Sequence, residues 1–210
     1  MKAVLFDVYE TLLTGERLAD REPLLRKIAS DFGLNFDREI DLTARLDQEI
    51  RLEHRRSSFS HPEIDMRVIW KTIFPSLDDP DAFALSAEEA IHPVKAIPGA
   101  EETLLELDQR AIKLGIISNA QAYTRTLLQK HLPIAWEKFD PRLLFFSYEH
   151  GVAKPGHELF KLAKNQLATI GILPHEVLMI GDSVTNDIDP AKAMGFETCL
   201  APDSTIEFLV

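Results

Sequence analysis

Short apolar runs constrain the fold of this chain more than any other feature of its sequence. There are five of them, each about the length of one buried strand, at residues 4–6, 112–117, 143–146, 177–180 and 198–200. Between the last four runs, apolar residues recur at the spacing that is typical of helices. Strands and helices that alternate in this way favour a parallel sheet covered by helices on both faces. The sequence therefore predicts an α/β fold.

The stretch that follows the first run has a helical pattern and no strand-like alternation. Apolar residues recur at helical spacing and stop at Gly33, a residue that suits the end of a helix. Asp37 is predicted to cap a second helix, which would include Ile40. Two further helices are expected around residues 64–72 and 81–91. This part of the chain is therefore predicted to be all-helical.

The two patterns divide the chain into two domains. The alternating pattern returns near Pro98 and Gly99, after the last of the predicted helices. We therefore expect a core of residues 1–14 and 96–210, with an all-helical domain of residues 15–95 inserted after the first strand.

The charge balance excludes two classes of partner. Lysine and arginine number 23 against 34 aspartate and glutamate residues, which gives a net charge of −11. Nucleic acids and anionic membranes need a broad basic surface. We therefore expect neither as a partner, and the sequence leaves a monomer and a homodimer equally open.

The cellular compartment is constrained by short apolar runs and a single cysteine. No run reaches the ~20 residues that a membrane-spanning helix needs, and the first one stops at Asp7, too early for a secretory signal. Cys199 alone cannot form an intrachain disulfide or a cysteine-based zinc site. It is compatible with a reducing cytosol, so we expect a cytoplasmic protein.

Polar residues follow several of the predicted strands. Asp7 follows the first strand, and Ser118 and Asn119 follow the second. Because the carboxyl ends of parallel strands face the ligand crevice, Asp7 is a candidate functional carboxylate, and Ser118 with Asn119 could bind an anion. The structural alternatives are that Asp7 hydrogen-bonds a turn and that Ser118 or Asn119 caps the next helix.

Two later segments add a cation and a pair of carboxylates. Lys154 follows the third core strand, where it could neutralise charge near a phosphate, although most lysines are simply solvated. Asp182 and Asp187 lie in a glycine-containing loop after the next strand. Oxygen ligands on a loop suit Mg²⁺, and the alternative is that Asp187 or Asn186 caps a helix.

Taken together and in this order, these residues resemble the haloacid dehalogenase-like (HAD) superfamily of hydrolases. The pieces that carry the resemblance are the segment 7–11, Ser118, Lys154, and Gly181-Asp182 with Asp187. Each motif is short, but their order and spacing agree along the whole chain. The resemblance implies a Rossmann-like three-layer core, in which the first strand is flanked by those that end at Ser118 and Asp182, and a helical (C1-type) cap.

The resemblance also implies roles for individual residues. Asp7 would be the nucleophile, and Mg²⁺ would be bound by Asp7, the Tyr9 carbonyl and Asp182, with Asp187 supporting the site. The phosphoryl oxygens of a small phosphorylated metabolite would be held by Ser118, Asn119 and Lys154. Thr11 would orient Asp7 or contact phosphate.

One residue departs from the pattern of the phosphatases. They carry a second aspartate, a general acid and base, where this chain has Tyr9. A phenol with a pKa near 10 is a poor base at neutral pH, and tyrosine here resembles the metal-independent 2-haloacid dehalogenases. The paired Asp182 and Asp187 instead resemble the Mg²⁺-dependent phosphatases. We therefore predict a Mg²⁺-dependent phosphatase, with a dehalogenase or a catalytically weakened phosphoryl-ligand binder as alternatives.

The predicted helical domain carries a basic segment whose role the sequence leaves open. Arg51, Arg55 and Arg56 lie within six residues. They could grip a substrate anion if they faced the cleft, because guanidinium groups bind carboxylate and phosphate well. The alternative is that they form the solvated face of a helix.

Overall fold

A five-stranded parallel sheet forms the centre of the molecule. The computed structural model describes residues 1–37 and 39–201 of the 210-residue chain. The strand order is β5-β4-β1-β6-β7, and all four neighbouring pairs are parallel. The strands are β1 (Ala3–Phe6), β4 (Lys113–Ser118), β5 (Phe139–Phe146), β6 (Val177–Gly181) and β7 (Glu197–Leu200). The α/β fold with β1 between the strands that end at Ser118 and before Asp182 is confirmed.

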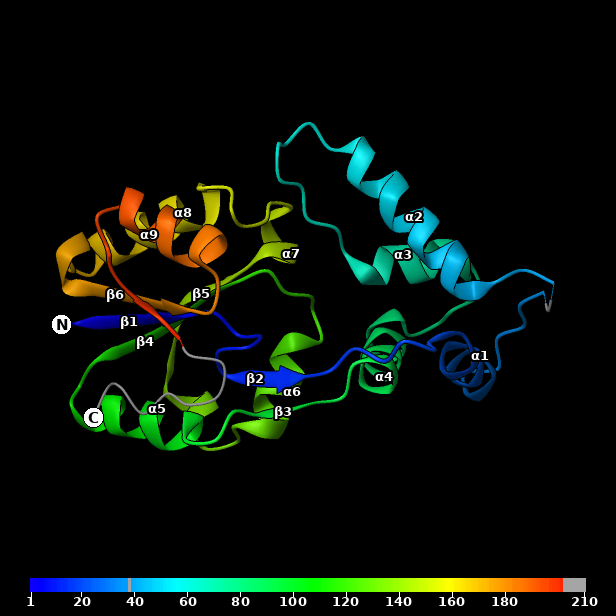
Figure 1. The fold of residues 1–210 in the computed structure, drawn as a ribbon, viewed down its shortest axis with the longest axis horizontal. Helices are drawn as coiled ribbons and strands as arrows, with labels where there is room; N and C mark the ends of the chain where they lie inside the picture. The colour runs from blue at the N-terminus through cyan, green and yellow to red at the C-terminus, as the bar shows by residue number, and fades with distance from the viewer. Residues whose placement is uncertain (38, 202–210) are drawn as a thin grey trace.

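Alternating side chains of β1 explain why the sheet is covered on both faces. Val4 and Phe6 are buried in one apolar cluster, whereas Ala3 and Leu5 are buried in another. Helices pack on each face (Figure 1). They are α5 (Ala100–Gln109) and α6 (Thr124–His131) on the first face, and α8 (Glu158–Thr169) and α9 (Asp189–Ala193) on the second. The result is a Rossmann-like core of three layers.

Short helical elements complete the core. They are the 3₁₀ turns η1 (Ala135–Lys138) and η2 (Pro174–Glu176), the π-helical turn η3 (Val184–Ile188) and the one-turn helix α7 (Ser147–His150). None of the helices within 1–37 and 39–201 combines the length and the apolar composition that crossing a bilayer requires.

Four helices form a lobe beside the sheet, which we call the helical lobe (Figure 1). Its own apolar cluster is rich in aromatic rings, with the Trp70 and Phe83 centroids 5.0 Å apart in an edge-to-face arrangement. Trp70 therefore packs within the core of the lobe. The helices are α1 (Glu22–Asp31), α2 (Leu42–Arg56), α3 (Met66–Ile73) and α4 (Pro80–Ile91).

The helical lobe is joined to the core by two paired strands that the sequence analysis missed. β2 (Leu13–Gly15) and β3 (Val94–Ala96) form an antiparallel ladder in which Gly15 pairs with Val94. A side chain at Gly15 would overlap the Pro93 carbonyl, so only glycine fits this close approach. The expectation of a purely helical stretch is therefore wrong at its two ends, where three-residue strands are too short to show alternation.

The second helix of the lobe begins later than predicted. It starts at Leu42, and its cap is Asp41, whose side chain accepts a hydrogen bond from the Ala44 N–H at 2.8 Å. Asp37 instead accepts from the Glu39 N–H at 2.9 Å and closes a local turn. Ile40 lies outside the helix and is exposed. Two aspartates four residues apart offered alternative starts, and the one directly before the buried Leu42 is the cap.

Candidate functional site

The ends of the three central strands bring polar groups to one edge of the sheet. In the parallel register, Phe6 of β1 pairs with Ile116 of β4 and with Ile180 of β6. The residues that follow these positions by one or two places therefore lie beside one another. They are Asp7 after β1, Ser118 at the end of β4, and Asp182 after β6.

A buried lysine lies between two of the carboxylates at this edge. The Lys154 ammonium is 2.8 Å from Asp7 Oδ1 and 2.5 Å from Asp187 Oδ1, and it donates to the Ile117 carbonyl at 3.2 Å. Lys154 is 4% exposed and Asp187 is fully buried. One cation therefore neutralises two carboxylates away from water. We call Asp7, Lys154, Asp182 and Asp187 the strand-end cluster.

Asn119 fixes the loop that carries Lys154. Its side chain accepts from the Lys154 N–H at 2.7 Å and donates to the Lys154 carbonyl at 2.9 Å. The segment then turns tightly, because the Gly156 N–H donates to the Ala153 carbonyl. The next helix begins only at Glu158, so Pro155 lies before it and outside its first turn. The Asn119 amide thus holds the lysine loop in place.

The glycine loop after β6 is shaped around Asp187. The Asp187 carboxylate lies so close to the Gly181 Cα that any side chain at position 181 would overlap it. Oδ2 of Asp187 accepts from the Ser183 N–H at 3.0 Å. Ser183 also caps the following turn by accepting from the Asn186 N–H at 3.1 Å, a role that the sequence assigned to Asn186 or Asp187 as an alternative. The spacing from Gly181 to Asp187 therefore follows from one compact loop.

Three carboxylates lie close together at this edge, and the pKa values of Asp182 and Asp187 are raised. One oxygen from each of Asp7, Asp182 and Asp187 lies within 4.8 Å of the others. Burial raises the pKa of Asp187 to about 6, against the opposing effect of Lys154. Burial, followed by the charge of Asp7, also raises the pKa of Asp182. Burial lowers the pKa of Lys154, but Asp7 and Asp187 more than offset this, so that it ends above its ordinary value. Crowded carboxylate oxygens of this kind suit a hard divalent cation.

Two hydroxyl groups at the same strand ends have no protein partner. Within residues 1–37 and 39–201, the buried side-chain oxygens or nitrogens without a hydrogen bond are Thr11 Oγ1 and Ser118 Oγ. Both residues are fully buried. An unsatisfied buried hydroxyl costs about 1–3 kcal/mol. Together with the carboxylate oxygens, these two donors fit a site that holds a divalent cation and an anion with several oxygens.

The two acidic or phenolic side chains next to Asp7 are already engaged. The Tyr9 hydroxyl is 3.0 Å from Thr124 Oγ1, and burial raises the pKa of the phenol well above its ordinary value. Glu10 adopts the left-handed backbone region with a φ of 56°, and its carboxylate accepts from Thr14 Oγ1 at 2.7 Å and from the Gly15 N–H. Neither side chain is a free acid or base.

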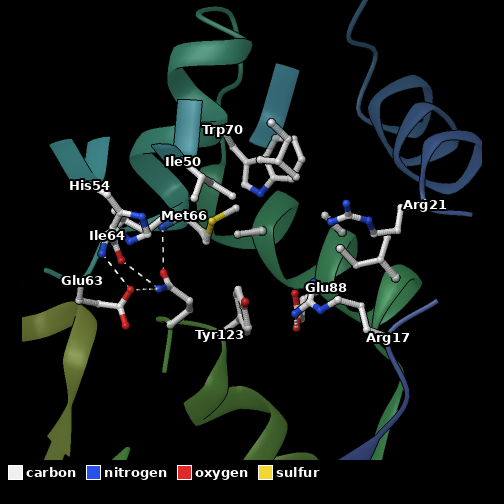
Figure 2. Close-up of a pocket in the computed structure, with 15 residues that line it drawn as sticks. Arg17, Arg21, Ile50, His54, Glu63, Ile64, Met66, Trp70, Glu88 and Tyr123 are labelled. Carbon is white, nitrogen blue, oxygen red and sulfur yellow. Dashed lines mark hydrogen bonds and ion pairs between the residues drawn. The ribbon is translucent and has the colours of Figure 1, made fainter. Parts of the chain in front are cut away.

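A cavity of about 340 Å³, which we call the lobe cavity, lies between the helical lobe and the core (Figure 2). A second cavity of about 250 Å³, the inner cavity, is lined by Tyr9 and Asn119 and so reaches the strand ends. The two cavities share five lining residues, so they are adjacent to each other. The shared residues are Arg17, Glu63, Glu88, Gln121 and Tyr123.

The cavity is lined by different basic residues from those that the sequence suggested. Arg51, Arg55 and Arg56 are exposed, and Arg56 pairs with Glu53 at 2.6 Å, so this segment is the solvated face of α2. Arg17 and Arg21 line the lobe cavity instead. Both lie just after β2, in a stretch without periodicity, and no sequence signal distinguished them from other surface arginines.

Comparisons with known proteins place this geometry among hydrolases. A model of the haloacid dehalogenase-like hydrolase family matches residues 1–195. The glyceraldehyde 3-phosphate phosphatase of Pyrococcus furiosus is 25% identical over 200 residues, which cover 94% of this chain and 79% of that protein. The same-named protein of Methanopyrus kandleri is 28% identical, with coverages of 94% and 82%. The crystal structure of a HAD phosphatase from Thermococcus onnurineus has a TM-score of 0.63 and 25% identity, and covers 96% of this chain and 86% of that one.

Proposed function

This chain belongs to the haloacid dehalogenase-like hydrolase family and is an enzyme, and from that premise we propose that it is a Mg²⁺-dependent phosphatase acting on a small phosphorylated metabolite. The observation that carries the proposal is the strand-end cluster beside two buried hydroxyls without partners, Thr11 and Ser118. The names of the relatives support the same reaction, because they are phosphatases of a small sugar phosphate.

Asp7 is the nucleophile in this proposal. One of its carboxylate oxygens attacks the phosphorus atom, the bond from phosphorus to the alcohol oxygen breaks, and an aspartyl phosphate forms. Water then attacks that phosphorus, which releases inorganic phosphate and restores the carboxylate. Lys154, 2.8 Å from Asp7 Oδ1, holds the carboxylate in place. Covalent catalysis of this kind splits one difficult displacement into two easier ones.

The cation would be held by the side chains of Asp7 and Asp182 and by the Tyr9 carbonyl, with Asp187 supporting the site through Lys154. When bound, Mg²⁺ supplies positive charge that lowers the repulsion between a carboxylate and a phosphate dianion. Ser118 and Thr11 donate their unpartnered hydroxyls to phosphoryl oxygens, and Lys154 adds a cation beside them. Asn119 acts by fixing the lysine loop.

One observation favours a second function, a metal-independent 2-haloacid dehalogenase. Tyr9 stands where a phosphatase would have its general acid, and halide leaves without a proton. Three crowded carboxylates oppose this alternative, because they repel the anionic haloacid when no cation is present. For this reason we place the phosphatase first.

The proposal is tested by an activity panel with acetyl phosphate, phenyl phosphate and 2-chloropropionate, each with MgCl₂ and with a chelator. We expect phosphate release that needs Mg²⁺ and falls at least about 1,000-fold in Asp7→Asn. Asp189→Asn is the matched control, because Asp189 is an exposed carboxylate at the start of α9, outside the strand-end cluster. Chloride release in the presence of the chelator would assign the dehalogenase. Phosphate ligands that bind tightly without turnover, equally in Asp7→Asn, would assign a non-catalytic binder.

A further inference from the structure

We propose that the substrate is an aryl phosphate, whose ring occupies the lobe cavity and whose oxygen leaves as a phenolate. This inference rests on the proposed phosphatase function and names its substrate class. Three independent features carry it: the apolar wall of the lobe cavity, the pairing of the charges around that wall, and the engaged state of the proton donors near the strand ends.

The wall of the lobe cavity is apolar and partly aromatic. Trp70, Ile50 and Met66 line it from the helical lobe, and Tyr123 lies on the opposite side (Figure 2). Cavities of a few hundred Å³ with such walls bind the apolar part of small molecules, and a few polar groups set the orientation. At about 340 Å³, this space is large for a short polar chain and suits a ring.

The charged residues around the cavity are already paired. Arg17 donates to Glu88 at 3.1 Å, and Arg21 lies 3.5 Å from Asp47. Glu63 accepts from Ser147 Oγ at 2.6 Å. A second anionic group on the substrate would have to break one of these ion pairs to obtain a cation. A substrate without a second anionic group leaves these ion pairs intact. The paired charges therefore favour a substrate whose alcohol portion is neutral.

The inner cavity lies between this wall and the loops that follow β1 and β4. It is lined by Tyr9 and Asn119, which lie in the loops after β1 and β4, and it shares Glu63, Glu88 and Tyr123 with the lobe cavity. A phosphoryl group at Asp7 would therefore direct its alcohol portion through the inner cavity towards Trp70. The leaving oxygen would lie near Tyr9, in the inner cavity.

Four titratable side chains near this path are already engaged in hydrogen bonds within the protein. The Tyr9 phenol and the Glu10 carboxylate are engaged as described above. Glu63 accepts hydrogen bonds through both oxygens, from Ser147 and from Gln121, so both oxygens are occupied. His92 contacts the Gly15 carbonyl at 3.2 Å and Glu88 at 2.9 Å, so that both ring nitrogens are occupied. None of these side chains is poised to protonate a leaving oxygen.

Without a proton donor, the leaving group must be stable as an anion. As the bond from phosphorus to oxygen breaks, the oxygen keeps the electron pair and departs as an anion, which takes its proton from solvent later. A phenol has a pKa near 10, about that of the tyrosine side chain. An alkyl alcohol is a far weaker acid, and losing general acid catalysis slows its departure by about 10²–10⁴. An aryl phosphate is therefore the phosphate monoester that this site can cleave without a general acid.

The first test compares kcat/KM for phenyl phosphate and 2-naphthyl phosphate with the value for glycerol 2-phosphate. We expect a preference of about 100-fold or more for the aryl esters. Because aryl esters are also more reactive in water, the cavity is tested by Ile50→Asp, with Leu52→Asp as the matched control. Leu52 lies on the same helix but is exposed. Ile50→Asp should raise KM for 2-naphthyl phosphate about 10-fold more than it raises KM for acetyl phosphate, whereas Leu52→Asp should change neither.

A second measurement does not depend on turnover. In a Trp136→Phe background, the remaining indole is Trp70 in the cavity wall. Binding of 4-nitrophenol should quench its fluorescence in a saturable way, and Ile50→Asp should abolish this. Acetyl phosphate turnover with no preference for aryl esters, no effect of Ile50→Asp, or no saturable quenching would each overturn the aryl assignment. Loss of all turnover would instead overturn the phosphatase proposal itself.

Discussion

The strand-end cluster and the lobe cavity differ in their balance of charged side chains. In the cluster, the exposed Asp182 lies beside the buried Asp7, Asp187 and Lys154, with contacts of 2.5 and 2.8 Å between the lysine and two of its neighbours. Around the lobe cavity, each arginine has its own carboxylate partner and the wall between them is apolar. One region keeps an excess of negative charge, and the other is balanced.

This difference separates reaction chemistry from recognition. An excess of carboxylates can be relieved by a cation, which is what phosphoryl transfer needs. In our proposal, the balanced and apolar cavity adds no further charge and would select the alcohol portion of the substrate by shape and polarity. The two regions should therefore respond differently to substitution, and four experiments test this.

The largest effect on stability is expected for Lys154→Met. This change leaves Asp7 and Asp187 buried without their cation, and removing one partner of a buried ion pair costs about 3–5 kcal/mol. Urea denaturation of the metal-free protein measures the loss. Lys161→Met, an exposed position on α8, is the control and should stay within about 0.5 kcal/mol. Equal stabilities would mean that the lysine does not hold the cluster together.

Asp182→Asn should weaken metal binding while it stabilises the metal-free fold. The variant loses a carboxylate ligand, so we expect Mg²⁺ affinity to fall at least about 10–100-fold. Because burial and the charge of Asp7 raise the pKa of Asp182, its ionised form is unfavourable in the folded protein without metal. Removing that charge should raise the free energy of unfolding at neutral pH. Calorimetric titration with MgCl₂ and urea denaturation measure the two effects, and both moving in the same direction would contradict the prediction.

Gln121→Ala tests the contact between the core and the helical lobe. The Gln121 side chain accepts from the Met66 N–H at 2.9 Å and donates to Glu63 and to the Ile64 carbonyl, so it joins the core to the helical lobe. Losing these bonds should cost about 2 kcal/mol of stability. Hydrogen exchange at the Met66 amide should become faster. Gln129→Ala, exposed on α6, is the control and should match the unchanged protein.

The smallest effect is expected for His92→Ala, and it should depend on pH. Its hydrogen bond to Glu88 raises the pKa of His92 above the ordinary 6.5. A raised folded-state pKa stabilises the protein fully below pH 6.5 and loses this contribution as the pH rises through the raised value. The variant should therefore be about 1 kcal/mol less stable at pH 6, and the difference should shrink towards pH 9.

His131→Ala provides a control of opposite sign for this measurement. Burial lowers the pKa of His131, so its contribution should be present at high pH and decrease as the pH falls below about 6.5. Thermal or urea unfolding at several pH values measures both variants. If the difference in unfolding free energy between wild type and His92→Ala does not change with pH, the imidazole charge contributes nothing to the contact with Glu88.

The strand-end cluster could be predicted from the sequence because backbone geometry determines it. Asp7, Ser118 and Asp182 come at strand ends, and parallel pairing then brings them together without any knowledge of side-chain packing. The burial of Lys154 between two carboxylates could not be seen this way. It depends on the Asn119 hydrogen bonds to the lysine loop, which no periodic pattern records.

The lobe cavity could not be predicted, because its residues come from segments whose relation depends on docking. Arg17 follows β2, Ile50 lies on α2, Glu88 on α4 and Gln121 in the loop after β4. The sequence pointed instead to Arg51 and its neighbours, a visible run of charge that lies on the outer face of α2. Clustering in the sequence was therefore a poor guide where the site is assembled from single side chains.

The pairing of β2 with β3 places the two ends of the helical lobe next to each other. Gly15 and Val94 are ladder partners, although 78 residues of chain lie between them. A segment whose ends already meet can gain or lose length without pulling on the strands that precede and follow it. We therefore expect that the chain can accept a differently built helical segment at this junction, grafted in place of α1–α4, while the arrangement of the strand-end cluster stays as it is.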